Sequence, residues 1–216
     1  MLISHRHKFV FIHVYKAAGS SLRDVLNPSA AISWSQSSIR DKWIGLTNLD
    51  SKCFSTHYGG HDTALNLKNH FPKTRFKEYF KFAFVRNPWD WQVSLYLFGL
   101  KDKSHFQHEL FKSFANFEAY LDWRIREDLH LQKDFLVDES GNLLVDFVGK
   151  LENLKEDFEY VCNKIQIQSI DLPHLNKSNS EKYQRFYNER TKQLLADAFK
   201  EDIEFFNYSY DNDRKN

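Results

Sequence analysis

The sequence predicts an α/β fold built on a parallel β-sheet. Two uninterrupted apolar runs, residues 9–14 and 82–85, are typical of strands that are buried on both faces of such a sheet. Each run leads directly into a segment with apolar residues at helical spacing, and strands that alternate with helices imply right-handed crossovers between parallel strands. The 216 residues suffice for one α/β domain but not for two domains with linkers, so we expect a single domain over residues 1–216.

The order of the other elements follows from turn residues and from helical periodicity. Residues 28–60 have no regular pattern, and residues 104–136 are expected to be largely helical. The sequence further predicts a strand at 143–148 and helices at 20–27, 62–70, 88–98, 153–165, 180–188 and 191–206. Ligands of parallel α/β folds bind outside the carboxyl ends of the strands, so the loops after the first two strands are the candidate sites.

The loop after the first strand reads Tyr15-Lys-Ala-Ala-Gly-Ser-Ser21. Its small residues allow backbone N–H groups to approach an anion, Lys16 supplies a positive charge, and Ser20 or Ser21 can cap the helix that follows. These features resemble those of a phosphate-binding P-loop. The pattern is not that of the nucleotide triphosphatases, because the lysine precedes the glycine and no acidic strand suited to magnesium is apparent.

The loop after the second strand also has the features of a phosphate site. Asn87 suits a helix N-cap, and Pro88 suits the first helical position. Ser94 lies two helical turns after Asn87 and so shares a helix face with the loop that carries Arg86. An alternative interpretation is an ordinary capped helix with Arg86 in a salt bridge. Taken together, the two loops predict a ligand with two separated phosphate groups.

Composition narrows the possible partners and the compartment. The net charge of +1 argues against a broad nucleic-acid or membrane surface. The two cysteines, Cys53 and Cys162, have neither metal-site nor disulfide spacing, and Cys162 falls on an apolar helical stripe. Residues 1–8 are too short and too polar for a signal peptide or membrane anchor, so we expect a cytoplasmic protein or a trimmed catalytic domain.

Several segments, in order along the chain, resemble the motifs of sulfotransferases. His13 to Ser21 resembles their 5′-phosphosulfate loop, and Phe84 to Tyr96 resembles their 3′-phosphate segment. Val145 to Leu154 is similar to a third family segment. Two stretches match the C-terminal pattern of the family: residues 172–178 and 187–208. The resemblance covers residues 9–210 and is nearest to the Golgi-type carbohydrate sulfotransferases and their small bacterial relatives.

This resemblance implies a P-loop-like three-layer fold with a central parallel sheet flanked by helices, and an enzyme that uses 3′-phosphoadenylyl sulfate (PAPS) and releases PAP without a metal. The acceptor would be a hydroxyl, expected on a carbohydrate. Tyr15 and Ala17 depart from the common proline and threonine of the family, but no charge that the nucleotide needs is lost. The resemblance assigns three groups of cofactor contacts: Lys16, Ala17, Ala18, Gly19, Ser20 and Ser21 to the 5′-phosphosulfate, Arg86 and Ser94 to the 3′-phosphate, and Lys177 and Ser178 to the nucleotide site.

Transfer of a sulfuryl group to a hydroxyl requires a base, and the pKa of histidine, about 6.5, suits that role. Related enzymes use a histidine between the two phosphate motifs, just before a helix. This position maps to His61, with His57 as the second candidate, while Lys16 would stabilise the leaving group as a second catalytic residue. His13 ends a buried strand and is interpreted as a core residue with satisfied hydrogen bonds. Trp89 and Trp91 are expected to pack their helix on the sheet, or one of them to flank adenine.

Two other functions compete with this prediction. A kinase could use similar strand–loop–helix sites, but it would need magnesium ligands and a lysine within the glycine-rich loop. A non-catalytic nucleotide-binding protein could keep the fold without the base. Replacement of His61 discriminates between the enzyme and the binding protein, because only an enzyme would lose turnover while it kept its nucleotide affinity.

Overall fold

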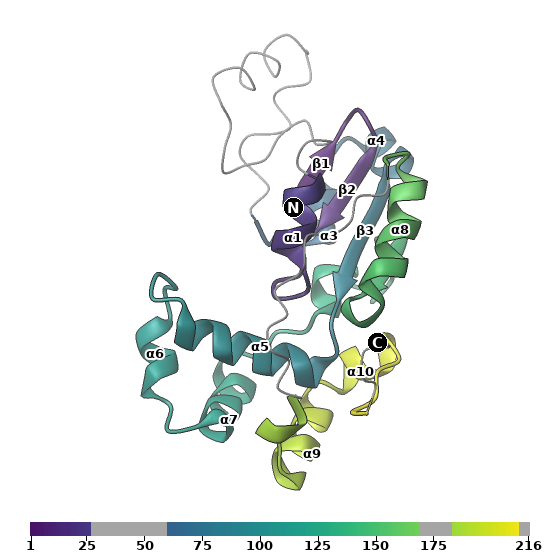
Figure 1. Ribbon diagram of the computed structural model, residues 1–216. Coiled ribbons are helices and arrows are strands. Elements are labelled where there is room, and N and C mark those ends of the chain that lie inside the picture. Colours follow the sequence, from purple (N-terminus) through teal and green to yellow (C-terminus); the bar gives the residue numbers. More distant parts are fainter. Residues whose placement is uncertain (27–59, 169–182, 212–216) are drawn as a thin grey trace. The chain divides into compact units, whose positions relative to one another are not determined.

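The computed structural model describes residues 1–26, 60–168 and 183–211 (Figure 1). The predicted residues His57, Lys177 and Ser178 lie outside these ranges. The chain divides into two compact units, which are described one by one. Unit 1 comprises Met1–Val85 and Asp134–Leu175, and unit 2 comprises Arg86–Lys133 and Asn176–Asn216. The prediction of one domain over the whole chain stays a prediction.

Unit 1 contains a four-stranded sheet in the order β1-β2-β3-β4. Its strands are β1 Leu2–Ser4, β2 Phe9–Ile12, β3 Phe80–Val85 and β4 Phe147–Lys150. Strands β2, β3 and β4 are parallel, as predicted, with Phe11 opposite Phe82 and Phe82 opposite Phe147. Strand β1 was not predicted and runs antiparallel to β2, which makes the sheet mixed at one edge.

The third predicted strand begins later than expected. Residues 136–144 form a turn in which the N–H of Asp138 donates to the carbonyl oxygen of Asn142 and the N–H of Leu144 donates to that of Leu136. Gly141 takes a φ of 80° in this turn. Because these backbone groups are already paired, the chain joins the sheet only at Phe147.

Helices flank this sheet, so the mixed α/β architecture is the predicted one. The helices of unit 1 are α1 Gly19–Leu26, α3 Ala64–His70, α4 Lys73–Glu78 and α8 Leu154–Lys164, with the 3-10 helix η4 at Leu151–Asn153. Helix α4 was not predicted. A second 3-10 helix, η3 Lys133–Phe135, lies where the chain returns from unit 2.

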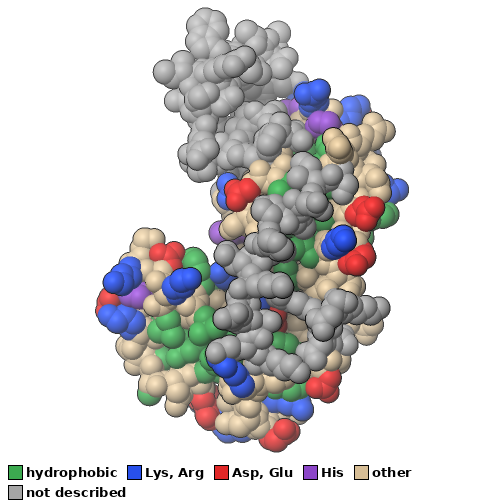
Figure 2. Space-filling model, in the orientation of Figure 1, with side chains coloured by type: hydrophobic (Ala, Val, Ile, Leu, Met, Phe, Trp, Pro, Cys, Tyr) green, Lys and Arg blue, Asp and Glu red, His purple; other side chains and the backbone are tan. Residues whose placement is uncertain are grey.

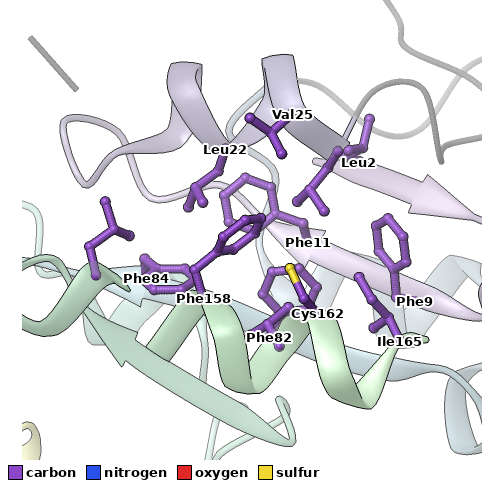
Figure 3. Close-up of a cluster of buried hydrophobic side chains, with 13 residues drawn as sticks. Leu2, Phe9, Phe11, Leu22, Val25, Phe82, Phe84, Phe158, Cys162 and Ile165 are labelled. Carbon is purple, nitrogen blue, oxygen red and sulfur yellow. The ribbon is translucent and has the colours of Figure 1, made fainter. Parts of the chain in front are cut away.

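The core of unit 1 lies between α1, α8 and one face of the sheet (Figure 3). Alternate residues of β2 and β3 point into it because successive side chains of a strand face opposite sides. Phe11 and Phe82 stack at 5.3 Å between ring centroids, and Phe158 and Cys162 of α8 belong to the same cluster. Cys162 is fully buried, as its helical stripe predicted.

The described residues of unit 2 form helices and the loops that connect them, without a strand. Unit 2 contains α5 Pro88–Lys101, α6 His108–Ser113, α7 Phe117–Glu127, η5 Tyr183–Phe186, α9 Glu189–Ala198 and α10 Lys200–Phe205. The single helix predicted at 191–206 is broken at Phe199, and the helix predicted at 180–188 is a short 3-10 turn where it is described. Asn188 and Thr191 form the capping box that starts α9.

Basic and acidic side chains are interspersed over the described residues that face the viewer in Figure 2, in keeping with a net charge of +1. Among the described residues, we find no helix with both the length and the apolar character needed to cross a membrane.

Candidate phosphate and base site

The loop that follows β2 has a strained backbone. Lys16 and Ala18 take φ values of 60° and 62°, in the left-handed region that L-amino acids other than glycine rarely occupy. Each such residue costs about 1 to 2 kcal/mol. Left-handed residues within a short loop turn successive backbone N–H groups toward one side and form a concavity that binds anions. The strain therefore points to a binding function.

The predicted phosphate-loop residues occupy this loop and the first turn of α1. Lys16 and Ala18 are half-buried, Ala17 and Gly19 are buried, and Ser20 is exposed. Helix α1 begins at Gly19, one residue earlier than predicted. Ser20 and Ser21 therefore lie inside the first turn, and the residue before the helix is Ala18, so the prediction that a serine caps α1 was wrong.

Gly19 is required by the close approach of the His13 ring. A Cβ atom at position 19 would lie 1.6 Å from Nε2 and 1.8 Å from Cδ2 of His13, far inside any contact distance. The two residues thus lock the end of β2 to the start of α1. No side chain larger than hydrogen fits at position 19 unless the imidazole moves.

His61 lies beside this loop within unit 1. Its Nδ1 is 3.2 Å from the carbonyl oxygen of His13, and the centroids of the two imidazoles are 4.5 Å apart. Tyr15 packs edge-on against His61 at 5.8 Å between centroids. Helix α3 begins just afterwards and is capped by Thr63, whose hydroxyl accepts from the N–H of Asn66 at 3.1 Å.

The electrostatic environment keeps both imidazoles neutral. Burial lowers the pKa of His13 from 6.5 to about 3, with smaller contributions from His61, the Met1 amino group and Arg23. The pKa of His61 is also lowered, chiefly by loss of solvation. The His61 residue as a whole is exposed, although its ring contacts the rings of His13 and Tyr15. A neutral histidine is the form that accepts a proton.

The prediction that His13 is a satisfied core residue was wrong in one respect. The ring is buried, with 7% of the residue exposed, but its Nδ1 has no hydrogen-bond partner among the described residues. An unpaired buried polar atom costs about 1 to 3 kcal/mol. The structure thus retains a histidine where packing alone would favour an apolar side chain.

The loop that follows β3 opens unit 2 and begins α5 as predicted. Asn87 is the N-cap, its side chain accepts from the N–H of Trp89 at 3.1 Å, and Pro88 is the first helical residue. Arg86 is buried and forms a two-pronged ion pair with Asp90: Nε and Nη2 lie 2.8 and 2.7 Å from the two carboxylate oxygens. Ser94 is half-buried on α5.

The ion pair is the alternative that the sequence left open for Arg86, and it is present. An ion pair does not by itself exclude a phosphate contact, because a guanidinium carries five N–H donors. A carboxylate on one edge also fixes the plane of the guanidinium. The structure thus shows an oriented arginine at a helix N-terminus.

Sequence reasoning missed three residues that hold Arg86. Gln132 pairs with the Arg86 backbone through two hydrogen bonds: its Oε1 accepts from Arg86 N at 2.9 Å, and its Nε2 donates to Arg86 O at 2.7 Å. Asp202 in turn accepts from the N–H groups of Gln132 and Lys133 at 2.8 and 2.9 Å. Asp90, four residues after Arg86, carried a helical-spacing signal; Gln132 and Asp202, 46 and 116 residues further along, carried none.

The two tryptophans of α5 are packing residues within unit 2. Trp89 donates from Nε1 to the carbonyl oxygen of Lys192 at 3.2 Å and lies edge-on to Tyr210, and its own carbonyl oxygen accepts from Tyr187. Trp91 is fully buried against Phe199. Both of these contacts are with the C-terminal helices and the residues around them.

The fold gives the class of protein: a P-loop-like α/β protein with a central sheet flanked by helices and a loop with left-handed residues after its second strand. The family described as "Sulfotransferase family" matches residues 1–209, and the chain belongs to this family. Sulfuryl transfer is thus its general chemistry.

Two individual proteins are similar to this chain. The chain is 30% identical over 120 residues to an uncharacterized protein of Archaeoglobus fulgidus, a match that spans 55% of this chain and 94% of the archaeal protein. Among solved structures, it is similar to mouse sulfotransferase SULT7A1, which was crystallised in complex with PAP. That likeness has a TM-score of 0.56 at 13% identity and covers 94% of this chain and 86% of the mouse chain, and at this identity it shows the shared fold.

Proposed function

We propose that the protein transfers a sulfuryl group from PAPS to a hydroxyl of a carbohydrate. The observation that supports the proposal is the strained loop at Lys16 and Ala18, which lies at the N-terminus of α1, where such a turn would bind an anion. PAPS as the donor is supported by the family and by the PAP in the mouse relative's crystal. A carbohydrate acceptor is supported by the sequence motifs, which are nearest to the carbohydrate branch of the family.

The proposal gives each loop one end of the nucleotide. The backbone from Lys16 to Gly19, with Ser20 and Ser21, would hold the 5′-phosphosulfate, and Arg86 with Ser94 would hold the 3′-phosphate. Lys177 and Ser178, outside the described residues, keep their proposed place in the nucleotide site. The oriented guanidinium of Arg86 favours this assignment because a planar fork of donors matches a phosphate better than a mobile point charge does.

The proposed chemistry needs a proton acceptor and a positive charge. Neutral His61 would accept the acceptor's hydroxyl proton while that oxygen forms its bond to sulfur, and the bond from sulfur to the bridging phosphate oxygen would break. Lys16 would stabilise the negative charge that develops on the departing phosphate. His57 stays the second candidate for the base. The cytoplasmic location also stays a prediction from the sequence.

The first experiment is a calorimetric titration with adenosine 3′,5′-bisphosphate. Wild type should bind with micromolar affinity, about −8 kcal/mol. Arg86→Ala should lose most of this affinity. Arg190→Ala, which removes an exposed arginine paired with Glu118 and Asp122 in the same unit, is the matched control and should bind like wild type. Absence of binding by folded wild type would overturn the proposal.

A second experiment separates binding from catalysis. PAPS is incubated with a panel of mono- and oligosaccharides, and release of PAP and sulfated product is followed. His61→Gln should keep the affinity for PAP and lose about 10²- to 10⁴-fold in turnover, the usual contribution of a general base. Retention of full turnover by His61→Gln would exclude His61 as the base. Turnover that depends on hydroxyl acceptors without sugar rings would contradict the carbohydrate assignment.

A further inference from the structure

His13 makes two contacts with His61 in unit 1. Its carbonyl oxygen lies 3.2 Å from Nδ1 of His61, and its ring packs on the His61 ring. The same ring fills the place of a Cβ at Gly19. One side chain therefore touches both the phosphate loop and the segment that carries the base.

The contact with the carbonyl oxygen selects a tautomer of His61. A carbonyl oxygen can only accept a hydrogen bond, so the proton must be on Nδ1 of His61. In a neutral imidazole with a proton on Nδ1, the lone pair is on Nε2. A neutral histidine held in this way presents Nε2, and only Nε2, as a proton acceptor.

The ring of His13 keeps His61 close to that carbonyl oxygen. Without a ring at position 13, the His61 imidazole would lose a packing partner 4.5 Å away and could rotate about its own side-chain bonds. The position of the His13 ring is itself set by the backbone at Gly19, where no Cβ intervenes. The contact therefore requires a ring at position 13, whereas Nδ1 of His13 has no partner among the described residues.

We propose that His13 is a positioning residue for His61: its carbonyl oxygen and its ring hold the His61 imidazole in the tautomer that leaves Nε2 as the proton acceptor. The inference rests on the proposed function of His61 as the base, and it adds a geometric link between that base and the phosphate loop. The link runs from Gly19 through the His13 ring to His61.

Nuclear magnetic resonance of the imidazole nitrogens tests the tautomer without any activity. In ¹⁵N-labelled wild type at pH 7.5 to 8, about a unit or more above the usual histidine pKa, long-range ¹H–¹⁵N spectra should show His61 with its proton on Nδ1. The His61→Gln spectrum assigns the signals. A proton on Nε2 in wild type would overturn the proposal.

Two variants of His13 then distinguish the role of its ring from the role of the ring nitrogens. His13→Ala keeps the carbonyl oxygen but removes the ring, so His61 should shift toward the Nε2–H form that predominates in free histidine, and kcat should fall about 10- to 100-fold from misplacement of the base. His13→Phe keeps a ring and should keep the Nδ1–H form. An unchanged tautomer in His13→Ala would overturn the role of the ring, and so would an equal shift in both variants.

The readouts separate the two claims, even where His13→Ala fails to fold. The wild-type spectrum and His13→Phe still decide the tautomer. A wild-type protein that holds His61 as Nδ1–H but transfers no sulfuryl group would support the positioning role and overturn the proposed function. In a wild type that does transfer, a proton on Nε2 would overturn the positioning role and leave the proposed function standing.

Discussion

The loops after β2 and β3 follow neighbouring parallel strands, yet they are built in opposite ways. The first places two non-glycine residues, Lys16 and Ala18, in the left-handed region and closes on a glycine. The second uses ordinary cap chemistry at Asn87 and holds Arg86 by side-chain hydrogen bonds to Asp90 and Gln132.

Because of this difference, the two loops should be sensitive to different substitutions. A site formed by backbone N–H groups is sensitive to the substitution of its small residues, because an added atom changes the path of the chain. A site formed by one oriented side chain is sensitive to that side chain and to its distant partners, because each buried hydrogen bond that is lost leaves a polar group unpaired. Two substitutions and a change of pH should therefore affect the two loops differently.

Gly19→Ala should have the largest effect, and it acts on the first loop alone. The new methyl group would overlap the His13 ring, and overpacking of this kind costs about 3 kcal/mol. Denaturant unfolding should show that loss, and calorimetry should show loss of PAP binding. Ala18→Gly is the matched control: it relieves the left-handed strain at a φ of 62° and should change stability by less than about 1 kcal/mol. Equal effects of the two changes would contradict a backbone-built site.

Asp202→Ala should have the next largest effect, and it acts on the second loop from far along the chain. The buried carboxylate accepts from the N–H groups of Gln132 and Lys133, and removal of charged hydrogen bonds should cost about 2 to 3 kcal/mol. Because Gln132 pairs with the Arg86 backbone, PAP affinity should fall as well. Asp197→Ala, an exposed carboxylate that pairs with Gln193, should change neither quantity. Normal PAP affinity in folded Asp202→Ala would break the link to Arg86.

The smallest effect is a pH dependence of stability at the first loop. The pKa of His13 falls from 6.5 to about 3 on folding, so the unfolded chain binds more protons between these values. The contribution of neutral His13 to the free energy of unfolding is therefore complete above pH 6.5 and is lost as the pH falls toward 3. The free energy of unfolding should fall by about 2 kcal/mol between pH 7 and pH 5 for this reason.

Denaturant unfolding at several pH values measures this effect. The lowered pKa values of His61 and of the Met1 amino group act with the same sign, so the contribution of His13 is the difference between wild type and His13→Gln. Between pH 7 and pH 5, the free energy of unfolding of this variant should fall by about 2 kcal/mol less than that of wild type. His70→Gln, at an exposed position on α3, is the control and should follow wild type. A parallel pH response in His13→Gln would show that His13 is not buried as a neutral group.

The sequence by itself determined the features that local chemistry controls. The apolar runs that became β2 and β3, the Asn87-Pro88 start of α5 and the small residues before α1 depend on neighbours within about two turns of helix, where propensity and capping act. Placement of Lys16 and Arg86 after adjacent parallel strands follows from the same patterns. His61 came from the resemblance to the family and stays a proposed base.

Tertiary structure alone decided the contacts between residues far apart in the chain. The antiparallel strand β1 pairs only because β2 offers an open edge, and its residues Leu2–Ser4 carry too short a pattern to predict a strand. Gln132 reaches Arg86, and Asp202 reaches Gln132, across gaps that no periodicity spans. His13 meets Gly19 and His61 only when β2, α1 and the start of α3 are folded together. The physical reason is that a hydrogen bond or a ring contact depends on distance in space, and distance in space between remote residues is a property of the whole fold.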